Sequence, residues 1–184
     1  GVLPGALCPT GMTFRVPAWR GPLIPPARGR WMGHMSLTHK NDTETMRRLI
    51  ADPGTWVVVG LSNNTDRDAH RVARWLKNEM HKAIIPVHHE AEVVDGDQGY
   101  ATISDIPDGD VKVVDLFVNS SEVGALVDEV IANKDRLQID AVWMQLGVED
   151  PAAADRAREA GLLVVMDTCP KIEWRQLRNE GASR

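Results

Sequence analysis

Short apolar runs recur at regular intervals along most of the chain, and polar or turn-forming residues flank each of them. The clearest run covers residues 55–59, reads TWVVV and is rich in β-branched residues. A continuous apolar run of this length is typical of a strand that is buried on both faces, as in a parallel sheet. The pattern predicts five such strands, over residues 55–59, 83–87, 111–117, 141–144 and 162–166.

Between these runs, apolar residues recur three and four positions apart, which indicates amphipathic helices. Cap and stop residues place the helices from Asp42 or Thr43 to Pro53, over residues 69–80, from Ser120 or Ser121 to Ile131, over residues 151–160 and over residues 172–177. Residues 100–107 are irregular and turn-rich. Strands that alternate with helices predict the α/β class, here a Rossmann-like open parallel sheet of about five strands with helices on both faces.

The first 40 residues do not share this regularity. They are rich in Gly, Pro and Arg, contain five basic residues and no acidic one, and show neither helical nor strand period. We therefore expect a disordered or extended segment over residues 1–40, one domain over residues 41–178 and a tail over residues 179–184. The alternatives for the first segment are a transit peptide, a start assigned upstream of a native Met35, or residues left from an affinity tag.

Charge and composition exclude several classes of protein. The chain carries a net charge of −5, and residues 41–184 hold 16 basic and 26 acidic side chains. Such an acidic body does not suit a general nucleic-acid binder, which needs a basic face. No apolar run approaches the length that spans a bilayer. The two cysteines, Cys8 and Cys169, form no disulfide framework, and no clear secretory signal is present, so we expect a cytoplasmic protein.

The residues that follow the first strand carry the strongest candidate chemistry, because ligands of open parallel sheets bind beyond the carboxyl ends of the strands. Gly60 allows a ligand to approach the backbone, and the positive end of the next helix suits a phosphate. Ser62 and Asn63 add hydrogen-bond donors, and Arg67 and Arg71 add positive charge. On the local pattern alone, these residues fit an ordinary strand-to-helix turn equally well.

Two other kinds of site are less favoured by the pattern. The loop lacks the GxGxxG pattern of NAD-binding domains, and Glu90 stands thirty positions after Gly60, where the acid for a ribose is expected after about 20. The run His88-His89-Glu90 contains metal-ligand residue types. Adjacent residues on an extended segment point to opposite sides, so we expect no metal ion there.

The remaining strand ends supply further candidates. Phe117 ends the third strand, and Met144 and Gln145 end the fourth, where a ribose or a linker could lie next to the permissive Gly147. Cys169 follows the fifth strand without a Cys–His–acid spacing, which favours a structural thiol over a nucleophile. A redox role would need an exposed, activated thiol. No acid–base pair gathers at the strand ends, so we assign no catalytic residue.

Residues 45–177 resemble the single-domain CoA-binding proteins, relatives of the N-terminal domain of the succinyl-CoA synthetase α subunit. The resemblance rests on WVVVGLSNN at 56–64, Arg67 with HRVA at 70–73, IPV at 85–87, VVDLF at 113–117, AVWMQLG at 141–147 and VMDTCPKIE at 165–173. It implies that the ADP part of CoA lies over the first two strands. The residues expected around the cofactor are Gly60, Leu61, Ser62, Asn63, Asn64, Arg67, Arg71, Val87, His88, Phe117, Met144, Gln145, Gly147 and Cys169.

The chain departs from this resemblance at two strand ends. Similar proteins usually continue the second strand with Asn-Pro, where this chain has His88-His89, and they carry basic residues where it has Val118-Asn119. Fewer charges there imply weaker phosphate binding or a different ligand.

The expected function is binding of CoA or an acyl-CoA without catalysis, with a protein partner or a second copy as further contacts. The alternatives are an NAD(P)-binding module or enzyme and a nucleotide-binding subunit of an acyl-CoA synthetase-type complex.

Overall fold

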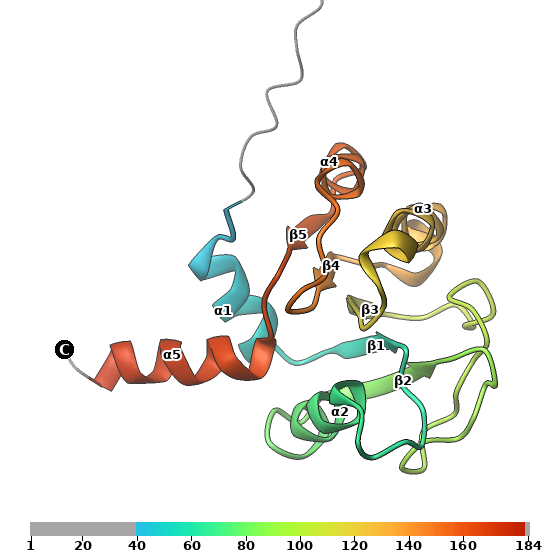
Figure 1. Ribbon diagram of the computed structural model, residues 1–184, viewed down its shortest axis with the longest axis horizontal. Helices are drawn as coiled ribbons and strands as arrows, with labels where there is room; N and C mark the ends of the chain where they lie inside the picture. The colour runs from blue at the N-terminus through green and yellow to red at the C-terminus, as the bar shows by residue number, and fades with distance from the viewer. Residues whose placement is uncertain (1–39, 183–184) are drawn as a thin grey trace, which may run out of the picture. The chain divides into compact units, whose positions relative to one another are not determined.

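The computed structural model describes residues 40–182, and these residues form an α/β domain around one parallel sheet (Figure 1). The strands are β1 (Thr55–Val59), β2 (Ala83–Val87), β3 (Val111–Leu116), β4 (Ala141–Met144) and β5 (Leu163–Val165). Their order across the sheet is β2-β1-β3-β4-β5, and each pair of neighbours is parallel. The Rossmann-like fold expected from the alternation of strands and helices is confirmed.

Helices cover both faces of this sheet (Figure 1). They are α1 (Thr43–Ala51), α2 (Asp68–Asn78), α3 (Ser120–Leu137), α4 (Pro151–Glu159) and α5 (Pro170–Ala182). Side chains of α3 and α4 belong to the apolar cluster on one face, and those of α1, α2 and α5 belong to the cluster on the other. Among the described residues, no helix is long and apolar enough to cross a membrane.

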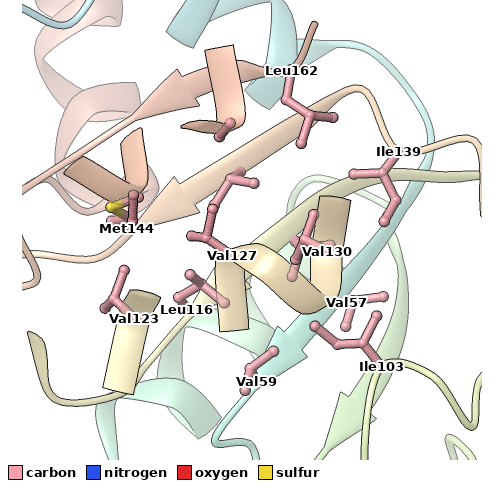
Figure 2. Close-up of a cluster of buried hydrophobic side chains, with 14 of the residues drawn as sticks. Val57, Val59, Ile103, Leu116, Val123, Val127, Val130, Ile139, Met144 and Leu162 are labelled. Atoms are coloured by element: carbon pink, nitrogen blue, oxygen red, sulfur yellow. The ribbon is translucent and has the colours of Figure 1, made fainter. Parts of the chain in front are cut away.

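The α3 face is an apolar core. Val123, Val127 and Val130 of α3 point at Val57 and Leu116 of the sheet, and all five are fully buried (Figure 2). Burying one such side chain stabilises the fold by roughly 1.5–3 kcal/mol. The β2–β3 connection contains no helix and adds buried side chains of its own to this layer, namely Ile103 and Ile106.

The opposite face mixes apolar and polar groups. Trp56 and Trp143 are fully buried there with ring centroids 5.7 Å apart, and the Trp143 Nε1–H donates to the Thr168 carbonyl over 2.8 Å. The buried Lys82 amine donates to the Leu49 carbonyl over 3.4 Å and also to the Asp52 carbonyl. These two bonds satisfy carbonyls at the end of α1, where a helix has none of its own N–H donors left.

Two expectations about helix boundaries needed correction. The cap of α3 is Asn119 rather than Ser120 or Ser121, because Glu122 closes a capping box on it. Helix α5 is longer than residues 172–177 and runs into the expected tail. Except for Lys40, the expected N-terminal segment over residues 1–40 lies outside the described residues.

Candidate functional site

A pocket of about 1010 Å³ opens at the carboxyl ends of β1, β2 and β3, between the first turns of α2 and α3. The chain leaves β1 toward β2 on one side and leaves β3 toward β4 on the other. This is the point at which the order of strands reverses, and ligands of open α/β sheets bind in the crevice that such a reversal creates. A volume of this size accommodates a large cofactor.

Gly60 holds the strand ends that form the floor of this pocket. Its N–H donates to the Val87 carbonyl over 2.8 Å, and the Phe117 N–H donates to the Val59 carbonyl over 3.0 Å. The φ angle of Gly60 is +90°, and a Cβ added here would lie 2.5 Å from the Phe117 carbonyl oxygen. Only glycine fits this position, because both the backbone conformation and the contact exclude a side chain.

The start of α2 is open to the pocket. Its N-cap residue is Arg67, whose side chain makes no capping hydrogen bond. Within the described part of the chain, no acceptor occupies the backbone N–H groups of Asp68 and Ala69. Arg67, Asp68 and Ala69 all line the pocket. Free N–H groups at a helix N-terminus favour an anion, and the Arg67 guanidinium adds a full positive charge to them.

The start of α3 carries a carboxylate of its own at the cap. The Glu122 carboxylate accepts hydrogen bonds from the Asn119 backbone N–H over 3.3 Å and from its side-chain amide over 3.2 Å. About two helical turns further on, the Glu129 carboxylate accepts hydrogen bonds from the Ser104 N–H and hydroxyl over 2.9 and 2.7 Å. Both carboxylates line the pocket, so its α3 side is acidic.

A buried carboxyl lies behind Gln145 of the pocket wall. The Asp115 side chain is inaccessible to solvent and accepts two hydrogen bonds from the Gln145 amide, over 2.7 and 2.9 Å. Burial raises the pKa of Asp115 to about 8, although the Gln145 amide acts in the other direction. Desolvation disfavours the charged form, which favours the protonated carboxyl near neutral pH. Gln145 lines the pocket and separates Asp115 from it.

The structure brings six of the expected cofactor residues to the pocket wall. They are Gly60, Arg67, Val87, His88, Phe117 and Gln145. The other eight do not line it: Leu61, Ser62, Asn63, Asn64, Arg71, Met144, Gly147 and Cys169. Which of them contact a ligand stays a prediction.

The residues placed away from the pocket wall have identifiable structural contacts. Leu61 and Met144 are core side chains. Asn63 joins two loops, since its amide donates to the Val93 carbonyl over 3.1 Å and its N–H donates to the Glu92 carboxylate over 3.2 Å. Asn64 is bonded locally, with its N–H donating to the Ser62 hydroxyl over 3.4 Å.

The other three also have contacts of their own. Arg71 pairs with Asp68 over 3.2 Å on the outside of α2. The Gly147 N–H donates to the Asp167 carboxylate over 2.7 Å. Cys169 is half-buried against the α2 face of the core, and burial raises the pKa of its thiol. A thiol with a raised pKa is less reactive, which does not support the redox alternative.

The premise behind the metal prediction was wrong. His88 and His89 do not point to opposite sides: their ring centroids are 4.1 Å apart, and both residues line the pocket. Strand β2 ends at Val87, so the alternation of a strand no longer applies to the residues beyond it.

Sequence reasoning missed several residues of the wall. Ala101 and Thr102 come from the irregular β2–β3 connection, and Leu126 and Glu129 come from the second and third turns of α3. The irregular composition of residues 100–107 was the available signal, because a long loop within a compact domain is often functional.

Comparisons with known proteins agree with this architecture. The family profile described as "CoA binding domain" matches residues 54–175. The uncharacterized protein YneT of Bacillus subtilis is 30% identical over 117 residues, which cover 62% of this chain and 81% of YneT.

Solved structures share the fold. A hypothetical protein from Pyrococcus horikoshii is 31% identical with a TM-score of 0.66, over 74% of this chain and 92% of that one. An acetyl-coenzyme A synthetase 1 from Ca. Korarchaeum cryptofilum matches at 21% identity with a TM-score of 0.54, over 66% of this chain and 27% of that one, and this likeness shows the fold alone. Because the family profile spans most of the described domain, this chain belongs to the CoA binding domain family.

Proposed function

We propose that this chain binds coenzyme A or an acyl-CoA through its ADP part in the pocket at the carboxyl ends of β1, β2 and β3. The observation that carries the proposal is the open start of α2, where free N–H groups and Arg67 face a pocket in a domain of this family. A diphosphate is the part of CoA that such a site recognises, because a helix N-terminus and a guanidinium both stabilise bound phosphate.

The shape of the pocket suggests how the rest of the cofactor lies. Val87 and His88 at the end of β2 would border the adenine or ribose, as the resemblance to single-domain CoA-binding proteins implies. On the other side, Leu126 and Leu146 supply apolar wall, and Leu146 is 63% exposed. An exposed leucine at the rim of a pocket suits the uncharged arm of CoA, which would shield it from water.

We propose binding without chemistry by this chain alone. The Asp115 carboxyl is fully buried and held by Gln145, and the Cys169 thiol lies outside the pocket wall. Neither group is placed to exchange a proton with a ligand in the pocket, since a general acid or base must reach the reacting atom directly or through one water.

Two arginines on one helix provide a matched test. Arg67 lines the pocket, whereas Arg71 does not and pairs instead with the carboxylate of Asp68, which does. Calorimetric titration with CoA, acetyl-CoA, ADP, NAD and NADP measures the preference of the pocket. Arg67→Ala should weaken CoA binding roughly tenfold, because a hydrogen bond to a charged group contributes about 1.5–3 kcal/mol. Arg71→Ala removes the same charge one turn further on and should change the affinity much less.

The outcomes separate the candidate functions. Tighter binding of CoA than of NAD, with a loss confined to Arg67→Ala, supports the proposal. Binding of NAD or NADP in preference to CoA would instead make the chain a dinucleotide-binding module. Equal losses in the two variants would contradict the placement of the phosphates at the start of α2, and no binding at all would refute the assignment of the ligand.

A further inference from the structure

Two imidazoles and a carboxylate meet at the mouth of the pocket. The His88 Nδ1 lies 3.9 Å from one oxygen of Glu90, and the His89 Nε2 lies 3.9 Å from the other. One ligand atom of each residue can be chosen so that all three lie within 4.8 Å of one another. The three side chains are 23%, 79% and 59% exposed, so an ion in solution can reach them.

The path of the chain explains why adjacent histidines converge here. The His88 N–H still donates to the Tyr100 carbonyl over 3.0 Å, as the last rung beside β2. The chain then turns, with the Ala91 N–H donating to the His88 carbonyl over 2.7 Å and Ala91 at a φ of +49°. This tight turn brings the His88 and His89 rings onto the same side, 4.1 Å apart and tilted by 40°.

We propose that His88, His89 and Glu90 form a site for one divalent transition-metal ion of the zinc class. Imidazole nitrogen and carboxylate oxygen are ligands that zinc prefers, and two histidines with one glutamate leave a fourth position open. Donor atoms around a tetrahedral zinc ion lie about 3.4 Å apart, since each bond measures about 2.0–2.2 Å. The three donor atoms lie within 4.8 Å of one another, so rotations of exposed side chains would bring them to this spacing. If the His88 Nδ1 is the donor, it gives up the hydrogen bond that it accepts from the Glu90 N–H over 3.4 Å.

The cluster would place this ion beside the pocket. His88 and His89 both line the pocket, so an ion held by them would lie at its mouth. Among the described residues that line the pocket, one is an arginine or lysine, namely Arg67, and three are acidic, namely Asp68, Glu122 and Glu129. Two positive charges at the mouth would offset this acidity, and they would attract a phosphate-bearing ligand. This consequence rests on the proposed function, whereas the binding of the ion does not.

The test uses the full chain, freed of metal with a chelator and then titrated with zinc sulfate in competition with a chromophoric chelator. We expect one ion per chain, bound with roughly micromolar affinity or tighter. His89→Ala and Glu90→Gln change exposed side chains, so both variants should fold, and each should weaken binding at least about tenfold. His81→Asn alters an exposed histidine outside the cluster, keeps a residue type that tolerates its φ of +53°, and should bind as the parent does.

Each result decides the proposal. Loss in the two cluster variants with retention in His81→Asn supports it. No zinc binding, or binding that survives His89→Ala, would overturn it and assign any bound ion to other residues.

Titrating CoA into the same protein with and without zinc keeps the two proposals apart. Zinc binding without CoA binding would refute only the proposed function. CoA binding without zinc binding would refute only the metal site.

Discussion

The two helices that begin at the pocket, α2 and α3, differ in the charge at their N-terminal caps. Helix α2 carries Arg67 at its cap without a side-chain capping bond, whereas the cap residue of α3, Asn119, is hydrogen-bonded to the Glu122 carboxylate. Both first turns face one cavity and both point the positive end of a helix dipole into it. The charges at the two caps therefore favour an external anion at the start of α2 over the start of α3, although Asp68 also adds a carboxylate to the first turn of α2.

The strands that lead into these helices, β1 and β3, also differ in the polarity of the side chains that they bury. Val58 of β1 and Asp115 of β3 are neighbours in register, and both are fully buried on the same face of the sheet. The strand before α2 is apolar at that level, while the strand before α3 contains a carboxyl. The electrostatic cost of burial therefore falls on β3, whose Asp115 side chain lies on the face of the sheet that α1, α2 and α5 cover. Substitutions in β1 and in β3 should respond differently to pH.

The largest expected effect concerns Asp115. The folded protein holds the pKa of this carboxyl at about 8, above its ordinary value of 3.8, because burial disfavours the charge. Between these values the native state keeps a proton that the unfolded chain releases, so the free energy of unfolding falls as pH rises. Through this group, the free energy of unfolding should fall by about 1.4 kcal/mol per pH unit from roughly pH 4 to pH 8, and by little more above pH 8. Asp115→Asn should remove this part of the pH dependence.

Urea denaturation at pH 5, 6, 7 and 8 measures this difference. The control is Asp135→Asn, which neutralises a carboxyl that is 91% exposed and should leave the pH dependence of the parent intact. Parallel curves for the parent and Asp115→Asn would show that the buried carboxyl is already ionised.

Replacing Gly60, after β1, or Gly124, in α3, with alanine should change the free energy of unfolding by a smaller amount. Gly60→Ala places a Cβ 2.5 Å from the Phe117 carbonyl oxygen at a φ of +90°, and should lower the free energy of unfolding by about 2 kcal/mol or more. Gly124→Ala, in α3, places a Cβ 3.2 Å from an Asp150 carboxylate oxygen without an unusual φ. The gain in helix propensity should keep its change within about 1 kcal/mol. Similar midpoints in urea for both variants would contradict the role of Gly60.

The sequence was sufficient for most of the fold because the strands are buried on both faces. Runs such as residues 55–59 leave few alternatives to a parallel strand, and that range matches β1. The cap of α3 was misplaced by one or two residues, because several polar residues in a row could each cap it. The choice depended on the Glu122 side chain folding back onto Asn119.

The site was less predictable because its walls come from contacts between distant segments. Strand ends could be located from the pattern, which brought Gly60 and Arg67 into consideration. The pattern did not show that the Asn63 amide bonds to Val93 thirty residues later, or that the turn after β2 would bring two imidazole rings together. Both depend on how the long β2–β3 connection packs, and no local period encodes that.

The smallest expected effect tests the comparison of the two helices directly. Glu122→Gln keeps an acceptor oxygen for Asn119 but removes the negative charge from the start of α3. The free energy of unfolding should fall by about 0.3–1 kcal/mol, because a charge that complements the helix dipole is lost. CoA affinity should rise a few-fold, because one carboxylate no longer repels the phosphates.

A matched variant separates these two consequences. Glu44 lies in the first turn of α1, outside the pocket wall, so Glu44→Gln should cost similar stability without changing CoA binding. Calorimetric titration at low and at high salt completes the measurement, since a gain caused by charge should shrink as salt screens it. A rise in affinity in both variants, or one that persists in high salt, would mean that the Glu122 carboxylate does not act on the ligand through its charge.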